Sequence, residues 1–517
     1  MPKFFRWQST YSVQQAGPGR LPWALRSIFM SRVQPRTLSI LAVLALFGAG
    51  ILFLGSRDFS GGVDAGIHYA IAEQINQYGA WPLPKSSFLG AIAHYPPAAH
   101  ILGIVAGALV GSTLKGLFFV AAGAFLLIYL VAADLMKRDS PVETIATLLV
   151  FTVLAVIFRK YRFIVGNEVV ANFFYAQLAG TAALMAGFYA AYQLSSLSFG
   201  WWLVLCAIIS HLISWFFPLN AVQFALAASV LRGAPLVDPR ENTKRRIFET
   251  LVTAGLAGAV AVVHPAMIDM AAISSNDGGI TISDGVMLYI VIGAIVLLPT
   301  FYLKMREPTS LRANAILSLG IGVSMPCLLL CALFYVGGFG SLYAVKKSGF
   351  LLGTLECLLL STLVVQWIFT KFPAKGRTRS FSPAATAASS SLFLAAAIAF
   401  VFAGRPSEAV SSLASYDRDV RQLLSQEVSR TFDGITVSMN STISPHANYL
   451  IGYALLRPTS SALAAQHGLF LSAQPNLGSA KFVLGSEIDG KTYASRCLIQ
   501  NSDRLAIILS ECASKGR

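Results

Sequence analysis

Charged side chains are scarce in this chain of 517 residues, where Asp, Glu, Lys and Arg together make up only 12%. A soluble globular protein carries roughly 25%. The 6 cysteines are too few for a disulfide scaffold, and 42 glycines with 22 prolines exclude a collagen-like chain. What is abundant is apolar surface, at 55% of residues. These proportions predict an all-α polytopic membrane protein and exclude a soluble or disordered one.

The basic excess is the second feature, since 39 Lys and Arg against 24 Asp and Glu give a net charge of +15. Loops on the cytoplasmic side of a membrane protein are rich in Lys and Arg and produce such an excess without a nucleic-acid partner. We therefore expect membrane lipids as partners and no nucleic acid.

Long apolar runs mark the expected membrane spans, each of which needs about 20 residues. The run 199–232 is too long for one span, and Pro218 and Asn220 near its middle predict two spans with a tight turn. We expect about eleven spans, of which the others cover 37–56, 116–134, 145–158, 174–193, 248–266, 285–303, 313–334, 348–369 and 385–403.

Basic segments set the expected topology. Residues 1–36 contain Lys and Arg but no acid, and the loops 240–246, 304–312 and 371–379 are also basic, so all should be cytoplasmic. An even number of crossings must then precede residue 233. We therefore interpret the short segment 97–113 as a re-entrant or interfacial helix, with the C-terminus outside.

The composition changes after residue 403, where no long apolar run follows. We expect three parts: a cytoplasmic tail 1–36, a membrane domain 37–403 with its first outer loop at 57–115, and a small extracytoplasmic α+β domain 404–517. Short alternating stretches at 434–439 and 480–484 indicate strands, and 506–509 is a further short apolar run. Cys497 and Cys512 either form a disulfide or remain two thiols.

The first outer loop carries unusual polar residues. From residue 63 apolar side chains follow helical spacing, which predicts an amphipathic helix along the membrane surface. Asp64 and His68 share a face near its start. Asp64 is either a helix cap or functional, and His68 either an ordinary polar-face residue or part of a site. His94 and Tyr95 precede two prolines that fix the chain direction.

Two later outer loops carry cations where the positive-inside bias does not expect them. Such cations either extend to lipid headgroups or hold one anion such as a lipid phosphate. A single phosphate held between the two loops is the simplest common cause, and the residues concerned are Arg159, Lys160, Arg162, Lys346 and Lys347.

An acidic surface helix after the first span, a Pro-Pro pair before an apolar segment, and Glu168 after the third full span form an ordered set over residues 37–235. This set resembles the GT-C membrane glycosyltransferases, which include lipid A aminoarabinose transferases, protein O-mannosyltransferases and oligosaccharyltransferases. Tyr343-x-x-Lys346 is weakly similar to bacterial arabinofuranosyltransferases. Tyr95 stands where the aminoarabinose branch usually has Lys, so the cations named above would supply its phosphate contact.

The resemblance implies an enzyme of the bacterial cytoplasmic (inner) membrane that moves a sugar from a polyprenyl-phosphate donor to an envelope glycan or lipid acceptor. It implies catalytic roles for Asp64 and Glu168, as base or as carboxylate ligands of Mg²⁺ or Mn²⁺. A metal-free mechanism is equally open. His68, His94, Tyr95 and Tyr343 join the outer cations as candidate substrate-binding residues.

Two other classes remain open on the sequence alone. A secondary transporter would use broken helices and an ionisable residue inside a span, such as Glu356. A non-catalytic assembly scaffold would use its C-terminal part to bind a partner. Within the spans, His211 and His264 are expected to be packing or hydrogen-bonding residues.

Overall fold

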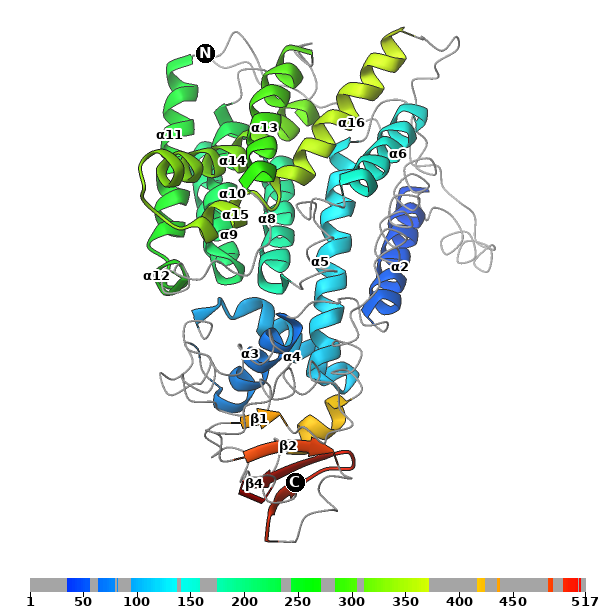
Figure 1. The fold of residues 1–517 in the computed structure, drawn as a ribbon. Helices are drawn as coiled ribbons and strands as arrows, with labels where there is room; N and C mark the ends of the chain where they lie inside the picture. The colour runs from blue at the N-terminus through cyan, green and yellow to red at the C-terminus, as the bar shows by residue number, and fades with distance from the viewer. Residues whose placement is uncertain are drawn as a thin grey trace, which may run out of the picture.

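The computed structural model describes the chain in segments, and everything below refers to these. They are 35–55, 64–79, 81, 94–136, 141–158, 174–233, 243–270, 284–304, 311–371, 416–423, 435–437, 482–486, 496–509 and 511–512. Figure 1 shows a bundle of long helices in the upper part, two shorter helices beneath it, and a small β-sheet at the lower end.

The apolar runs form helices where the sequence predicts them. They are α2 (Pro35–Gly55), α5 (Thr113–Met136), α6 (Pro141–Phe158), α8 (Tyr175–Gln193), α9 (Phe199–Phe216), α10 (Pro218–Gly233), α11 (Thr243–Val262), α13 (Asp284–Lys304), α14 (Leu311–Cys331) and α16 (Leu352–Lys371). The expected span 385–403 lies outside the described residues. Among those described, four helices are long and apolar enough to cross a membrane: 113–136, 199–216, 312–336 and 342–371. The count of eleven therefore stays a prediction.

The break inside 199–232 falls where the sequence predicts it. Phe217 adopts an extended conformation, with φ −161° and ψ 106°, and Pro218 begins α10. Proline is favourable at a helix start because it has no N–H to leave unpaired and its φ is already helical. The long apolar run is thus two helices joined by one non-helical residue.

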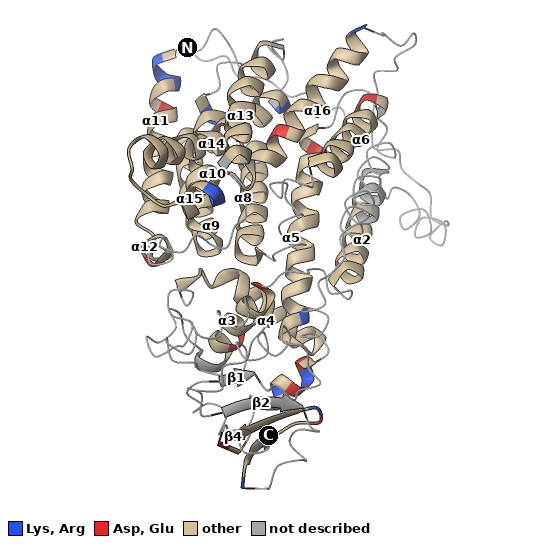
Figure 2. Cartoon of the chain, in the orientation of Figure 1, with Lys and Arg blue, Asp and Glu red and all other residues tan. Residues whose placement is uncertain are grey.

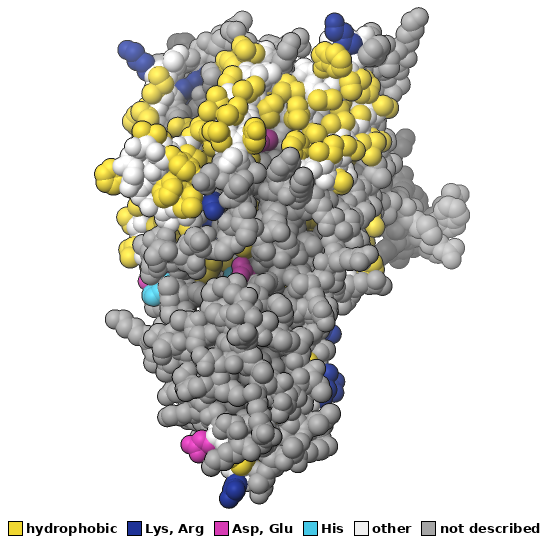
Figure 3. Space-filling view, viewed as in Figure 1, with side chains coloured by type: hydrophobic (Ala, Val, Ile, Leu, Met, Phe, Trp, Pro, Cys, Tyr) yellow, Lys and Arg dark blue, Asp and Glu magenta, His cyan; other side chains and the backbone are white. Residues whose placement is uncertain are grey.

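The outer surfaces of the bundle helices are apolar. On α9, the side chains of Trp201, Val204, Ile208 and Leu212 are 46–68% exposed along one face. Figure 3 shows apolar side chains covering the upper helices on the face in view. Such a large exposed apolar surface fits lipid rather than water, and supports a multi-pass membrane protein.

The segment 97–113 forms α4 (Ala98–Val110), a helix of 13 residues. At 1.5 Å per residue it is about 20 Å long, shorter than the ~30 Å hydrocarbon layer. It packs against α3 (Asp64–Tyr78) and α5 beneath the bundle (Figure 1). This length agrees with the re-entrant or interfacial interpretation. A Cβ on Gly116 of α5 would collide with the backbone of Gly103 and Gly107 of α4, so the two helices touch through glycine.

The C-terminal part contains a four-stranded sheet in the order β1-β2-β4-β3. Its strands are β1 (Ile435–Val437), β2 (Phe482–Ser486), β3 (Leu498–Asn501) and β4 (Leu505–Leu509). β1 and β2 are parallel and the other pairs antiparallel. The two predicted strands are therefore confirmed as β1 and β2, the apolar run 506–509 lies in β4, and β3 was not predicted. The domain boundary at 404 stays a prediction.

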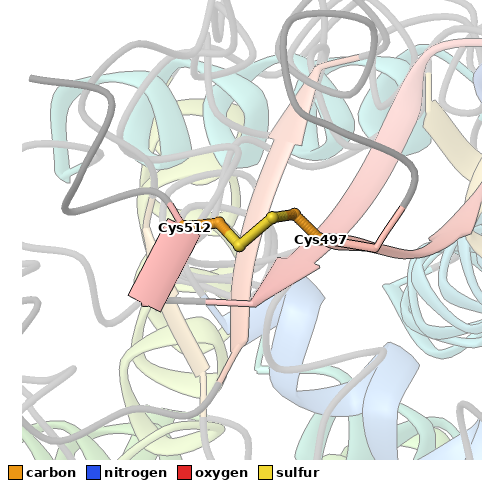
Figure 4. Close-up of a disulfide and its surroundings, with 2 residues drawn as sticks. All are labelled: Cys497 and Cys512. Atoms are coloured by element: carbon orange, nitrogen blue, oxygen red, sulfur yellow. A yellow bond between two sulfur atoms is a disulfide. The ribbon is translucent and has the colours of Figure 1, made fainter.

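Cys497 and Cys512 form a disulfide with their Cα atoms 5.9 Å apart (Figure 4). It ties the start of β3 to the segment after β4, and the disulfide alternative from the sequence is the correct one. The four cysteines of the bundle, Cys206, Cys327, Cys331 and Cys357, are free.

Charge is distributed unevenly along the long axis. The basic start of α11 and the last turn of α16, which carries Lys371, lie at the end of the molecule away from the sheet (Figure 2). The predicted topology places these basic ends together on one side and the sheet on the other. The arrangement is compatible with it, and the sidedness itself stays a prediction.

Candidate active site

Helix α3 begins at Asp64 and carries the first part of the site. The sequence correctly predicts a helix here, and its position along the membrane surface stays a prediction. Ala65, Tyr69 and Ala72 are fully buried and His68 is 3% exposed, so neighbouring elements cover α3 on several sides. His68 is therefore a buried residue, which excludes its reading as an ordinary polar-face side chain.

A chain of hydrogen bonds runs from His68 to the proline turn. His68 Nδ1 lies 2.9 Å from His100 Nε2, and His100 Nδ1 lies 3.1 Å from the Pro96 carbonyl oxygen. A carbonyl only accepts, so His100 Nδ1 donates and its Nε2 accepts from His68 Nδ1–H. In the neutral state this fixes one tautomer of His68, with an unprotonated Nε2.

Burial lowers the pKa of both rings in this histidine pair. For His68 the proximity of His100 and Lys347 adds to the effect of burial, and for His100 the pKa falls to about 4 although its bond to Pro96 opposes the shift. Both rings are therefore neutral at pH 7, as the tautomer assignment requires.

The proline turn places the Tyr95 side chain. Trp81 Nε1 donates to the Tyr95 carbonyl at 2.9 Å, and the Tyr175 hydroxyl donates to the carbonyl of Ala99 at 2.5 Å. These bonds hold the turn at both ends, and α4 begins just after Pro97. The backbone that carries the Tyr95 side chain is therefore fixed by hydrogen bonds at both ends of the turn.

Tyr95 meets Tyr343 across 248 positions of sequence, with the two hydroxyl oxygens 3.0 Å apart. The Tyr95 ring is partly exposed, but its hydroxyl lies inside the protein. Burial, with a smaller contribution from the Asp64 carboxylate, raises the pKa of the Tyr95 hydroxyl to about 12, while the bond to Tyr343 opposes the rise. The Asp64 carboxylate therefore lies near enough for its charge to influence both tyrosines of the pair.

Tyr343 belongs to α15 (Leu342–Ser348), which the sequence predicts as an outer loop. The prediction of a loop is wrong, because residues 342–348 are helical and packed in the protein, while their position on the outer side stays a prediction. Lys346 and Lys347 are 9% and 5% exposed. Lys347 Nζ lies 3.2 Å from the centroid of the Phe174 ring and 5.4 Å from that of Tyr343. Snorkelling of these two lysines to lipid headgroups is therefore excluded.

The backbone before α15 explains how this segment enters the interior. A π-helical turn, η4 (Ala332–Val336), ends α14, and Gly338 and Gly340 follow with φ +67° and +99°. Only glycine adopts such angles without strain. The segment therefore reverses sharply, and the carbonyls of Lys347 and Ser348 accept bonds from Gln177 and Gln223 of the bundle.

The structure thus brings together Asp64, His68, Tyr95, Tyr343 and Lys347, which the sequence names from two separate segments. Lys346 lies on the same short helix. Glu168, Arg159, Lys160 and Arg162 fall outside the described residues, so their predicted positions stay predictions.

The site also contains residues that the sequence did not predict, namely His100, Phe174, Tyr175, Gln177 and Gln223. The sequence of α8 does not mark Tyr175 or Gln177 as site residues. Only the tertiary packing of α8 brings their side chains against α4 and α15.

His94 lies apart from the tyrosine pair, with Nδ1 3.5 Å from a carboxylate oxygen of Asp269. Nearby, Trp215 donates to His211 at 3.2 Å, and its ring packs at 4.5 Å from that of His264. His264 Nδ1 accepts from the Ala266 N–H. The expectation that His211 and His264 pack and form hydrogen bonds is confirmed.

The side chains of this site determine whether it could bind a metal ion. Among the described residues, no group of three or more His, Cys, Asp and Glu side chains could hold a metal ion. Among the described residues, Asp64 is the one carboxylate whose charge influences the Tyr95–Tyr343 pair, and the Lys347 ammonium lies against Tyr343. Mg²⁺ and Mn²⁺ favour several oxygen ligands. The described residues do not fit such an ion by themselves.

Glu356 lies elsewhere, in α16 against α13. A Cβ on Gly293 would come within 3.0 Å of its carboxylate, so the glycine makes room for it. Its Oε1 is buried without a hydrogen-bond partner among the described residues. Glu356 therefore does not belong to the constellation around Asp64.

The sequence matches no family model and no curated protein. Among solved structures, the chain is similar to ArnT from Cupriavidus metallidurans bound to undecaprenyl phosphate, at 14% identity and a TM-score of 0.42. That alignment covers 92% of this chain and 97% of ArnT. The apo ArnT structure aligns at 12% identity and a TM-score of 0.39, over 90% and 97% of the two chains.

Proposed function

We propose that the protein is a membrane glycosyltransferase that moves a sugar from a polyprenyl-phosphate donor to an envelope glycan or lipid acceptor. One observation carries the proposal: a carboxylate, two tyrosine hydroxyls and a buried lysine from separate segments meet in one site. Asp64 acts on the Tyr95–Tyr343 pair, and Lys347 lies against Tyr343. A base and a phosphate-binding cation are the two groups that this reaction needs.

The acceptor hydroxyl oxygen attacks the anomeric carbon of the donor, and the bond from that carbon to the phosphate oxygen breaks. Asp64 takes the proton that the hydroxyl loses, as a carboxylate within reach can. The polyprenyl phosphate leaves with added negative charge. Lys347 stabilises that charge in a site where burial has removed water and strengthened electrostatic interactions.

The tyrosine pair has an orienting role in this scheme. Its raised pKa keeps the Tyr95 hydroxyl protonated, so it donates a hydrogen bond to a sugar or phosphate oxygen instead of acting as a base. This arrangement replaces the lysine that the related branch carries at position 95, since Lys347 brings the cation from α15.

We further propose that the reaction runs without a divalent metal, because a lysine takes the place that a cation would hold beside the phosphate. Treatment with a chelator should leave turnover of the purified protein unchanged. Loss of turnover that only Mg²⁺ or Mn²⁺ restores would instead assign Asp64 and Glu168 to a metal site.

The test of the proposed function is turnover on a panel of polyprenyl-phosphate sugars, with purified protein in nanodiscs and release of polyprenyl phosphate as the readout. At least one sugar should be consumed by the parent and not by Asp64→Asn. If no sugar on the panel is consumed and the protein instead moves such a lipid or a solute across vesicles, the secondary-transporter class is correct and Glu356 becomes its candidate residue.

A further inference from the structure

A charged cavity lies away from the Asp64 site, where the turn between α4 and α5 meets the C-terminal part. Its volume is about 510 Å³. Three segments far apart in sequence each supply a basic side chain to it: Lys115 from α5, Arg418 and Arg421 from the helix 416–423, and Arg504 from the turn before β4. Figure 2 shows ribbon segments of both charge types close together between the lower end of α5 and the sheet.

The acids of the cavity lie mostly behind the cations. Asp419 is 2% exposed and accepts two bonds from the Arg504 guanidinium, at 2.8 and 3.0 Å. Asp417 is 4% exposed and lies 3.4 Å from Arg421. The side chains of Arg421 and Arg504 are 41% and 48% exposed. Buried carboxylates therefore hold the arginines from the inside, while the outer part of each arginine side chain is exposed at the cavity.

The surface that a ligand meets is accordingly cationic. Lys115 and Arg418 are exposed and Asp503 is the one exposed acid of the lining. Arg504 also stacks on Tyr416, with its guanidinium carbon 4.6 Å from the ring centroid, which fixes its direction. Several oriented cations around a single open acid fit a phosphate group.

An apolar face adjoins the cavity. On α4, Ile101, Val105 and Leu109 repeat at helical spacing and are 45%, 55% and 85% exposed. Val110 continues this face and lines the cavity itself. Lys115 stands in the first turn of α5, which is long and apolar enough to cross a membrane, so the cavity lies where that helix would enter the bilayer.

We propose that this cavity and the exposed face of α4 form a binding site for a phosphate-bearing lipid, with its headgroup among the four cations and its acyl chain along α4. The shared chemistry is a phosphate, and the apolar face selects a lipid over a free phosphate ester. This site is separate from the proposed active site and does not depend on the proposed transferase activity.

The test is binding of phosphatidylglycerol to the purified full chain, measured by native mass spectrometry against phosphatidylcholine. The parent should bind the anionic lipid more tightly. Lys115→Ala and Arg418→Ala should each weaken that binding about fivefold, because a basic residue near a lipid phosphate contributes a factor of this size. Lys244→Ala, at the opposite end of the molecule, is the matched control and should change nothing.

A second arm separates the lipid from a free ester. Leu109→Gln should weaken binding of phosphatidylglycerol and leave binding of glycerol 3-phosphate unchanged, since only the lipid uses α4. Equal binding of the two lipids by the parent would overturn the proposal. So would Lys115→Ala and Arg418→Ala variants that bind like the parent, or a parent that binds glycerol 3-phosphate but shows no preference for the anionic lipid.

Discussion

At the scale of single residues, the account depends on Asp64 as the base and on the hydrogen-bonded pair His68 and His100, here called the histidine relay. As the base, Asp64 should not tolerate Asn, and Asp64→Asn should lower turnover by about 10²–10⁴. Glu73, on the same helix, is the comparison. Its replacement by Gln should leave turnover within a few-fold of the parent, while thermal unfolding confirms that both variants are folded. Near-normal turnover of Asp64→Asn would make Asp64 a helix cap.

The histidine relay makes a prediction about pH. The folded protein keeps His68 and His100 neutral, whereas the unfolded chain protonates them near pH 6.5. A lowered pKa means that the unfolded state binds more protons on acidification. The melting temperature should therefore fall as the pH drops from 6.5 towards 4. His100→Gln keeps an acceptor for His68 and removes one titrating ring.

The difference in melting temperature between pH 7 and pH 4.5, measured in parent and variant, tests the relay. A smaller fall in His100→Gln supports it, because that variant has lost one of the two groups. An equal fall in both proteins would show that carboxylates elsewhere control the acid response. Histidine ¹⁵N NMR shifts give an independent check, since they report directly whether His68 carries its proton on Nδ1.

At the scale of helices and loops, the sequence predicted some elements correctly and others wrongly. Local patterns located three elements: helical spacing located α3, a short apolar segment located α4, and a proline inside a long apolar run located the break at Pro218. They failed at 335–347, where glycines and two lysines suggest a loop. There a π-helical turn and two positive-φ glycines bend the chain inward, and packing against Phe174 compensates the burial of a charge. The pairing of Tyr95 with Tyr343 depends on this long-range packing and has no local signal.

Contact between α4 and α5 depends on glycine, which gives a stability test. Gly116→Ala would place a methyl group against the backbone of Gly103 and Gly107. Overpacking of this kind costs about 1–3 kcal/mol, so the melting temperature should fall. Gly255→Ala on α11 is the matched control, because a Cβ there meets nothing within 4 Å. If both variants melt like the parent, the two helices are not held at this distance.

At the scale of the whole molecule, the two ends should lie on opposite sides of the membrane. The basic start of α11 and the basic ends of α13 and α16 predict a cytoplasmic side, and the disulfide between Cys497 and Cys512 suits an oxidising one. A reporter that is active only outside the cytoplasm should work after residue 404 and be silent near 240, 308 and 375. Activity near 240 would restore 97–113 as a full span.

The most direct measurement of the central claim compares donor binding and sugar transfer in the same preparations, with undecaprenyl phosphate as the binding probe. Asp64→Asn should bind the probe like the parent and transfer no sugar. Lys347→Ala should bind it about tenfold more weakly, Lys347→Arg should recover part of that loss, and Lys371→Ala should bind normally. Asp64→Asn that transfers like the parent, or Lys347→Ala that binds like the parent, would contradict the assignment of base and phosphate-binding cation to this site.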